Sequence, residues 1–124
     1  MLVLDDDAAI REVLSEVLEE EGYQVKSAAN GREGLQILRA NDGSAGLILL
    51  DLMMPIMNGW DFRALQLQDP ALATIPVVVL SADRDIRLKA ASISAHDYLA
   101  KPVDLNVLVE AVRRHYPNSG EQTP

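Results

Sequence analysis

Five short apolar runs alternate along the chain with longer segments in which apolar residues recur every three or four positions. A short apolar run is typical of a strand that is buried on both faces, whereas the longer spacing is typical of a helix with one buried side. The pattern therefore predicts five strands and five helices in strict alternation. The strands are expected at residues 2–4, 24–27, 47–50, 77–80 and 97–100.

Several predicted helices have a recognisable first or last residue. Asp7, Asn30 and Asp104 each precede a helical segment and carry a side-chain oxygen that can accept hydrogen bonds from its first turn. Gly22 follows the first helix, where a residue in the left-handed region is expected. In the first helix the predicted buried stripe consists of Ile10, Val13, Leu14, Val17 and Leu18. In the last helix it consists of Leu105, Leu108, Val109 and Val112, with Val107 and Ala111 outside it.

The alternation of strands and helices indicates an α/β fold. Parallel strands need long crossover connections, and helices provide them along a right-handed path. The sequence therefore predicts a doubly wound (βα)5 domain with a five-stranded parallel sheet that helices cover on both faces. Residues 1–116 are expected to form this domain, and the polar residues 117–124 are expected to form a tail or the start of a linker.

Polar or charged residues end four of the five apolar runs. Asp5 and Asp6 follow the first run, and Asp51 follows the third. Ser81 ends the fourth run, and Lys101 ends the last. Because ligands of such sheets bind at the carboxyl ends of the strands, these side chains are expected to meet at one edge. Carboxylates gathered in this way repel one another and favour a hard cation such as Mg²⁺.

The residue types at this edge suit the transfer of a phosphoryl group to a carboxylate. Asp51 is the candidate nucleophile, because a carboxylate can attack phosphorus to form an acyl phosphate. Asp5 and Asp6 are the candidate ligands of Mg²⁺, which screens the repulsion between carboxylate and phosphoryl oxygens. Lys101 supplies a second positive charge, and the Ser81 hydroxyl can donate a hydrogen bond to a phosphoryl oxygen.

Four segments, in this order and spacing, resemble the receiver domain of two-component response regulators, of the chemotaxis-regulator type. The segments are LVLDDD, LILLDLMMPIMNGW, VVVLSA and DYLAKPV, and the resemblance covers residues 2–116. It implies a flavodoxin-like receiver fold in which Asp51 accepts a phosphoryl group from a histidine kinase or a phosphotransfer protein. It also implies that Mg²⁺, with Mn²⁺ as an alternative, is held by Asp5, Asp6, Asp51 and the backbone carbonyl of Met53.

The resemblance also implies a switch. Ser81 is expected to move toward the phosphoryl group, and Tyr98 to turn inward with it. Lys101 is expected to contact the phosphoryl group and to be followed by a cis peptide bond. The face made by the fourth helix, the fifth strand and the fifth helix would then bind a downstream protein target, an output domain or a second copy of the chain. The domain is not expected to be an enzyme, beyond slow self-dephosphorylation whose rate Met53 and Asp83 influence.

The chain departs from the family pattern at three positions. Ser94 stands where a glycine is usual before the last strand, so this loop is expected to be strained or differently shaped. Asn58 stands where Asp often precedes Gly59, which is a mild change because Asn also tolerates the left-handed region. Val103 stands where Phe often follows the Lys-Pro pair, and it leaves less aromatic surface near the last helix.

Two other functions fit parts of the same pattern. A phosphatase of the haloacid-dehalogenase type would use Asp5 and Asp7 as its paired aspartates. That motif wants Thr or Val where this chain has Ala9, and the chain lacks room for the cap that such enzymes usually carry. A receiver-like binding module that signals without phosphate would not need the acids, Ser81 and Lys101, yet the sequence alone leaves this alternative open.

Composition and charge limit the partners and the compartment. The chain has 124 residues, enough for one domain, and a formal net charge of −8. An acidic balance argues against nucleic acid or an anionic membrane as a direct partner, since both need clustered Lys and Arg. No apolar run approaches the ~20 residues that span a bilayer. Since cysteine and a secretory signal are both absent, the sequence predicts a soluble, cytoplasmic domain.

Three aromatic or imidazole side chains have no role in this scheme. Trp60 is expected either to be partly buried on the third helix or to face a partner protein. His96 and His115 lie far apart in the sequence and are expected at the surface, not as metal ligands or phosphorelay histidines.

Overall fold

The computed structural model describes residues 1–41 and 45–116. Within these residues, five strands and five helices alternate as the sequence predicts. The strands are β1 (Leu2–Leu4), β2 (Lys26–Ala28), β3 (Ile48–Asp51), β4 (Val77–Ser81) and β5 (Asp97–Ala100). The helices are α1 (Ala8–Glu20), α2 (Gly31–Ala40), α3 (Gly59–Gln68), α4 (Ile86–Ser92) and α5 (Leu105–His115). Among the described helices, none has the combination of length and apolar character that crossing a membrane requires.

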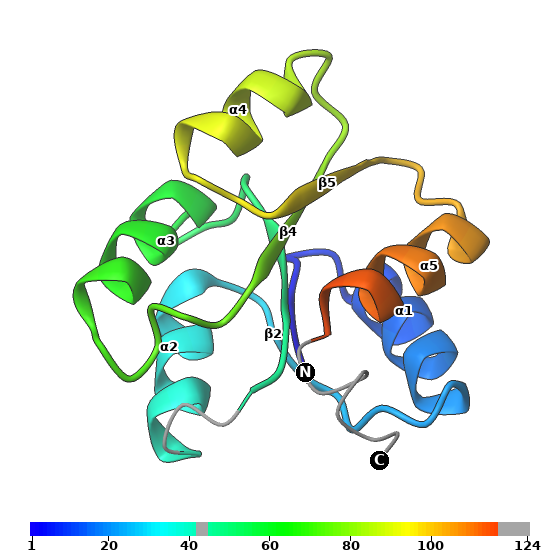
Figure 1. The fold of residues 1–124 in the computed structure, drawn as a ribbon, viewed down its shortest axis with the longest axis horizontal. Helices are drawn as coiled ribbons and strands as arrows, with labels where there is room; N and C mark the ends of the chain where they lie inside the picture. The colour runs from blue at the N-terminus through cyan, green and yellow to red at the C-terminus, as the bar shows by residue number, and fades with distance from the viewer. Residues whose placement is uncertain (42–44, 117–124) are drawn as a thin grey trace.

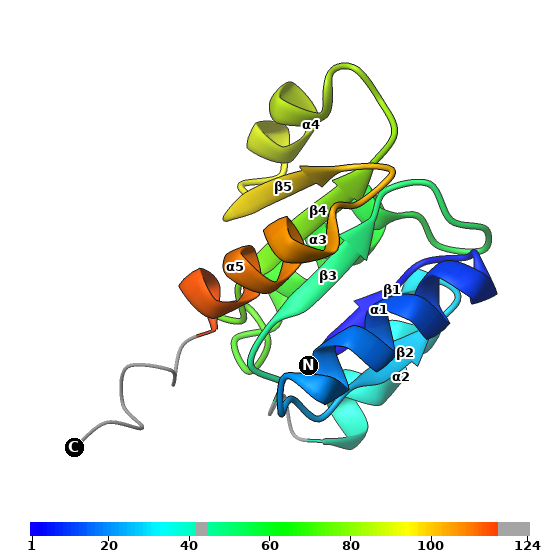
Figure 2. The ribbon, with the colours of Figure 1, turned by 90° about the vertical axis from the view of Figure 1, so that its right-hand side faces the viewer.

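The five strands form one parallel sheet in the order β2-β1-β3-β4-β5. The chain steps outward from β1 to β2, returns to the other side of β1 with β3, and continues to β5. Figure 1 shows α1 and α5 on one side of the strands and α2 and α3 on the other, and Figure 2 shows α1 and α5 in front of the sheet. The expected doubly wound α/β fold is confirmed.

The three middle strands β1, β3 and β4 bury side chains on both faces of the sheet, whereas the edge strands β2 and β5 are partly exposed. In β4, Val78 and Leu80 pack with α1 and α5, whereas Val77 packs with α2 and α3 and Val79 packs with α4. All four side chains are fully buried. A strand covered on both faces has no polar side to show in its sequence, which explains the continuous apolar runs.

The expected helix caps are present. The Asp7 carboxylate accepts hydrogen bonds from the first turn of α1, Asn30 caps α2, and Asp104 caps α5. Gly22 has a φ of +96°, in the left-handed region. Asn58 corrects an expectation, because its φ is −78° and its side-chain oxygen accepts from the N–H of Asp61, 2.9 Å away. Asn58 is therefore suited to its position because it caps α3, not because Asn tolerates a left-handed backbone.

Three assignments of the helix stripes were wrong. Leu105, in the predicted buried stripe of α5, is 39% exposed. Val13 is 47% exposed, because it lies at the edge of the α1 stripe beside an open apolar hollow that Val103 and Leu105 also line. Ala111 is fully buried in the α1–α5 core, although it was placed outside the stripe of α5. A helix face that meets a twisted sheet is wider than a strict three-to-four spacing suggests, and a small residue fits where the two come closest.

The loop before β5 has the strained backbone that the sequence suggests. Ser94 has a φ of 55°, in the left-handed region that disfavours residues with a Cβ. The buried guanidinium of Arg63 holds this loop, with Nε 2.9 Å from the carbonyl oxygen of Ile93 and Nη2 2.8 Å from that of Ser94. Its Nη1 donates to Gln66, whose amide in turn donates to the carbonyls of Leu72 and Ile75. The buried polar network thus joins α3 to the end of α4.

Candidate functional site

Three carboxylates meet at the carboxyl edge of the sheet, where β1 and β3 end. One oxygen from each of Asp5, Asp6 and Asp51 lies within 4.8 Å of the others. Asp5 and Asp51 are buried, whereas Asp6 is exposed. Asp5 directly follows β1 and Asp51 ends β3. These two strands are parallel neighbours with Leu4 opposite Leu50, so the two acids lie side by side. The parallel pairing therefore brings together acids that are 46 residues apart in the sequence.

Asp5 has a different partner at each of its carboxylate oxygens. Its Oδ1 accepts a hydrogen bond from the N–H of Asp7, 2.9 Å away. Its Oδ2 is buried and pairs with the Nζ atom of Lys101, 2.7 Å away. Because an ammonium group can rotate its protons toward an acceptor, this contact is an ion pair. An oxygen with spare acceptor capacity inside an acid cluster is suited to a cation.

Asp51 is a buried carboxylate at the end of β3. Its Oδ1 lies 3.2 Å from the N–H of Met53, and its Oδ2 lies 3.4 Å from the Nζ of Lys101. The pKa of Asp51 is raised to about 6, chiefly by burial and also by the charge of Asp5, while the Met53 N–H and Lys101 act in the opposite direction. A cation bound beside Asp51 would favour its ionised form.

Lys101 lies between the two buried acids. Burial lowers its pKa, but the hydrogen bond to Asp5 and the charge of Asp51 more than offset this, so the pKa is raised above its ordinary value. The peptide bond between Lys101 and Pro102 is cis, as expected. Because its pKa is raised, the Lys101 ammonium stays charged beside the carboxylate of Asp51 at neutral pH.

The remaining predicted residues lie on β4, β5 and the loop after β3. Ser81 is buried at the end of β4, and its Oγ accepts from the N–H of Asp83 at 3.0 Å. Tyr98 is 38% exposed on β5. The side chain of Met53 is 68% exposed, although its N–H binds Asp51. The structure thus places Ser81 and the Met53 backbone beside the acids and leaves the Tyr98 ring accessible to solvent.

Gly59 allows the loop after β3 to fold back on the site. A Cβ atom at Gly59 would lie 2.8 Å from the carbonyl oxygen of Asp51 and 2.8 Å from the Cα of Leu52. Real Cβ contacts are never this close to backbone atoms, so α3 begins against the end of β3 only because its first residue has no side chain.

A hollow of about 360 Å³ opens above the acids. Asp51, Ser81 and Lys101 line its floor, and Trp60, Asp83 and Lys89 are the lining residues that come from α3, the β4–α4 loop and α4. The Lys89 ammonium forms an ion pair with the Asp83 carboxylate and lies 5.8 Å from the centre of the Trp60 ring. Sequence reasoning missed Lys89, because the weak pattern of α4 did not show which of its residues turns toward the sheet edge.

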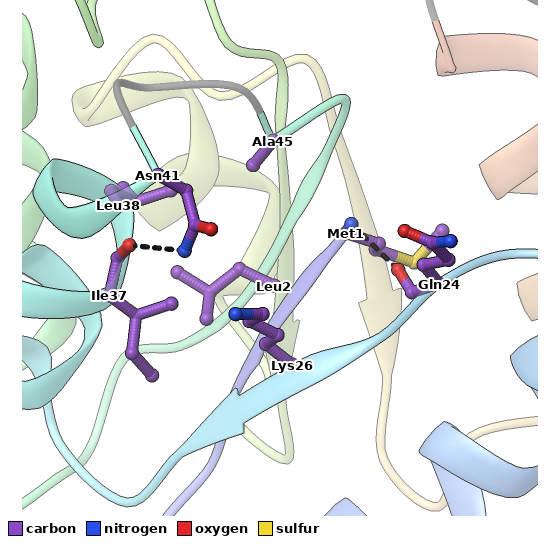
Figure 3. A pocket seen from close by; sticks show the side chains of 8 residues that line it. All are labelled: Met1, Leu2, Gln24, Lys26, Ile37, Leu38, Asn41 and Ala45. Carbon is purple, nitrogen blue, oxygen red and sulfur yellow. Dashed lines mark hydrogen bonds between the residues drawn. The ribbon is translucent and has the colours of Figure 1, made fainter.

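A second hollow, of about 110 Å³, lies beside the first residues of β1 and β2 (Figure 3). Asn41 closes one end by donating from Nδ2 to the carbonyl oxygen of Ile37, 2.8 Å away. The described residues that line this hollow include Lys26 but no carboxylate. It therefore lacks the ligands that a hard cation requires.

The two histidines lie close together, which corrects the view of them as isolated. The ring centres of His96 and His115 are 6.5 Å apart. The Nε2 of His115 lies 2.9 Å from Asp97, and the Nδ1 of His96 accepts from the N–H of Val77. Burial lowers the pKa of His96. These contacts join α5 to the first residue of β5, and neither histidine lines the hollow above the acids.

Comparison with known proteins agrees with this geometry. The chain matches the family described as response regulator receiver domain over residues 1–113. It is 39% identical, over its whole length, to the alkaline phosphatase synthesis transcriptional regulatory protein SphR of Synechococcus elongatus, of which it spans 52%. The chain thus spans about half the length, or less, of the curated relatives it matches.

Two solved structures are similar throughout. The signal receiver domain of a signal transduction histidine kinase from Syntrophus aciditrophicus has a TM-score of 0.84 and 33% identity, over 99% of this chain and 92% of that one. The chemotaxis response regulator CheY4 of Vibrio cholerae has a TM-score of 0.81 and 29% identity, over 91% of this chain and 94% of that one. With its flavodoxin-like fold and its acidic sheet edge, the chain belongs to the receiver domains of two-component response regulators, a family of regulatory proteins and not of enzymes.

Proposed function

We propose that this chain is a phosphoryl acceptor whose accepting residue is Asp51. The observation that supports the proposal most is the position of the Asp51 carboxylate, which lies between a paired cation, Lys101, and the acids Asp5 and Asp6. A carboxylate in a purely structural role would be neutralised by its partner and would not need two further acids beside it. Residues 1–116 form the receiver domain in this proposal, and 117–124 lie outside the described residues.

The cation that fits the acid cluster is Mg²⁺, with Mn²⁺ as an alternative. Asp5, Asp6 and Asp51 would hold it together with the backbone carbonyl of Met53, because oxygen ligands suit both ions. The buried Oδ2 of Asp5, which has spare acceptor capacity, supports this fit. When bound, the ion would neutralise the charge of the phosphoryl oxygens as they approach Asp51.

The reaction is a displacement at phosphorus. An oxygen of the Asp51 carboxylate attacks the phosphoryl group of a phosphohistidine on a histidine kinase or a phosphotransfer protein. The new O–P bond forms as the P–N bond breaks, and the bond's electron pair leaves with the imidazole. Lys101 pairs with a phosphoryl oxygen, and the Ser81 hydroxyl donates to another. Water later attacks the same phosphorus atom, the O–P bond to Asp51 breaks, and inorganic phosphate leaves, which restores the carboxylate and limits the lifetime of the signal.

The phosphorylated domain would act on partner proteins. Ser81 turns toward the phosphoryl group, Tyr98 turns inward from its exposed position, and the face made by α4, β5 and α5 changes with them. A downstream protein target, an output domain or a second copy of the chain would bind this face. The curated relatives are transcriptional regulators about twice as long or more, which supports an output domain as one partner. This scheme places the protein in the cytoplasm, without direct contact to nucleic acid or membrane.

The phosphatase alternative is disfavoured by the position of Asp7. Its Oδ1 accepts from the N–H groups of Ala9 and Ile10, at 2.9 and 3.2 Å, and so caps α1. Because two backbone N–H groups engage this oxygen, Asp7 is not free to act in catalysis as the phosphatase alternative requires. A module that binds partners without phosphate is the second candidate, and the following experiment separates the two.

The test is the intact mass of the protein after incubation with acetyl phosphate, with and without Mg²⁺. The wild type is expected to gain one phosphoryl group only with Mg²⁺, and Asp51→Ala is expected to gain none. Asp61→Ala, which removes an exposed acid from α3, is the control and should gain the group like the wild type. If the folded wild type gains no group from acetyl phosphate or from phosphorylated histidine kinases, the phosphate-independent module is the correct assignment.

A further inference from the structure

A lysine of α4 reaches the mouth of the acid site and is paired there with an acid of its own. The Lys89 ammonium forms its ion pair with Asp83, from the loop between β4 and α4. Both residues line the hollow that contains Asp51 and Lys101. A side chain with a four-carbon stem and a charged end can change partners within such a hollow without a change in backbone fold.

The partner of Lys89 is tied to the hydroxyl of the proposed switch. The N–H of Asp83 donates to the Oγ of Ser81 at 3.0 Å, and the Asp83 Oδ1 accepts from the N–H of Asp85 at 2.9 Å. If Ser81 turns its hydroxyl toward a phosphoryl group, the acceptor of the Asp83 N–H moves. The loop must then follow the hydroxyl or lose this bond, and either event shifts Asp83 relative to Lys89.

Phosphorylation also changes the charge of the hollow. An ionised Asp51 carries one negative charge, whereas a phosphoryl group carries about −1.5 to −2 at neutral pH. Lys101 is already shared between Asp5 and Asp51, at 2.7 and 3.4 Å. The added negative charge therefore exceeds what Lys101 can neutralise, and Lys89 is the other cation that lines the hollow.

The two partners available to Lys89 differ in strength. The side chains of Lys89 and Asp83 are 33% and 37% exposed, so water screens their ion pair and replaces it readily. A phosphoryl group offers three acceptor oxygens with more charge, and an ammonium that binds them forms a charge-assisted hydrogen bond. The exchange of Asp83 for the phosphoryl group is therefore favourable.

We propose that Lys89 exchanges partners when Asp51 is phosphorylated: its ammonium leaves Asp83, binds the phosphoryl group and draws α4 toward the site. This inference rests on the proposed phosphorylation of Asp51. Because Lys89 also lies against Trp60, the single tryptophan of the chain, the exchange removes a cation from the indole ring.

The test uses beryllofluoride with Mg²⁺ as a non-hydrolysable mimic of the phosphoryl group. Lys89→Gln is expected to weaken beryllofluoride binding by about three- to tenfold, the range for a partly solvated charge-assisted bond. Arg87→Gln removes the same charge from an exposed position of the same helix, outside the residues that line the hollow, and should bind like the wild type. Equal affinity of Lys89→Gln and Arg87→Gln would overturn the inference.

A double-variant cycle separates partner exchange from a general charge effect. Asp83→Asn keeps an oxygen for the Asp85 N–H and releases Lys89, so it is expected to tighten binding by about two- to threefold. In the Lys89→Gln background, Asp83→Asn should have no effect. If it tightens binding equally in both backgrounds, Asp83 acts only through its charge and the exchange does not occur.

Fluorescence of Trp60 gives a readout that does not depend on affinity. At saturating beryllofluoride, the emission of the wild type should change as Lys89 leaves the ring. Lys89→Gln should show no such change, because the cation is already absent. If the wild type gains no phosphoryl group by intact mass and binds no beryllofluoride, the proposed function fails first. If it does both and Lys89→Gln behaves like the wild type, only the role of Lys89 is wrong.

Discussion

The ammonium group of Lys101 lies 2.7 Å from the Asp5 carboxylate, across a sheet in which β3 and β4 separate the strands that carry them. This contact joins the end of β5 to the end of β1 over the top of the two middle strands. Asp51, at the end of β3, also contacts the Lys101 ammonium group. The charge balance of the site therefore depends on three strands at once.

The first prediction concerns the pH dependence of stability. The folded-state pKa of Asp51 is about 6 and its ordinary value is 3.8, so ionisation of this carboxyl costs the folded protein more than the unfolded chain. Its contribution to stability is complete below pH 3.8 and is lost as pH rises through 6. Asp51→Asn should therefore raise the free energy of unfolding by about 2–3 kcal/mol at pH 8 without divalent ions.

Urea unfolding of the wild type and Asp51→Asn in EDTA, at pH 5 and pH 8, checks this. The difference between the two proteins should be about half as large at pH 5 as at pH 8, because at pH 5 the unfolded chain is already ionised while the folded protein is still mostly protonated. A difference that is equal at both values would show that the variant acts through packing and not through the buried charge.

The second prediction concerns a divalent ion. Mg²⁺ at ten times its dissociation constant should raise the free energy of unfolding by about 1.4 kcal/mol, because only the folded protein brings the three acids together. Asp6→Asn removes an exposed ligand without removing a buried contact and should abolish most of this gain. Thermal unfolding with and without Mg²⁺ measures it, and Asp61→Asn is the matched control. The same Mg²⁺ response in wild type and Asp6→Asn would exclude Asp6 as a ligand.

The third prediction concerns the buried guanidinium of Arg63. Arg63→Met removes the donors to the carbonyls of Ile93 and Ser94 and leaves the Gln66 oxygen without its donor. The free energy of unfolding should fall by about 2–4 kcal/mol, since buried acceptors are left unsatisfied. Arg39→Met, which breaks an exposed pair with Asp69, should cost less than about 1 kcal/mol. Equal losses in urea titrations of the two variants would mean that the Arg63 network adds nothing.

The fourth prediction concerns the backbone of the loop before β5. Ser94→Gly relieves a left-handed φ of 55° and should stabilise the protein by about 0.5–1 kcal/mol. Ser92→Gly, two residues earlier in α4, should destabilise it, because Ser92 has helical backbone and its Oγ donates to the carbonyl of Lys89. Differential scanning calorimetry of both variants measures the contrast. Destabilisation by Ser94→Gly would mean that its side chain contributes more than its backbone costs.

The sequence predicted the strands and their charged ends well because burial on both faces leaves a continuous apolar run. Asp5 and Asp51 lie at the ends of such runs, Lys101 follows the partly exposed β5, and parallel pairing places strand ends side by side without further information. The cis peptide bond after Lys101 came from the resemblance and not from any pattern of burial. What a strand ends with was therefore the most informative part of the chain.

Polar residues on helices were predicted poorly. Arg63 is only 3% exposed and Gln66 is fully buried, but a charged or amide residue on a helix is normally solvated, so periodicity placed neither inside. Lys89 was likewise indistinguishable from a surface charge, because the turn that brings it to Asp83 depends on how α4 packs. His96 and His115 meet only because α5 ends beside the start of β5.

Arg63 donates hydrogen bonds to the carbonyls of Ile93 and Ser94, so the C-terminal end of α4 is held in place. This helix has seven residues and is about 10 Å long, so a 20° rotation about that end would swing its first turn by about 4 Å. The swinging end is the one that follows the Asp83 loop, beside the acids. α4 could therefore rotate about its fixed C-terminal end, and a small displacement of its first turn at the sheet edge would tilt the whole helix and reorient its outer surface.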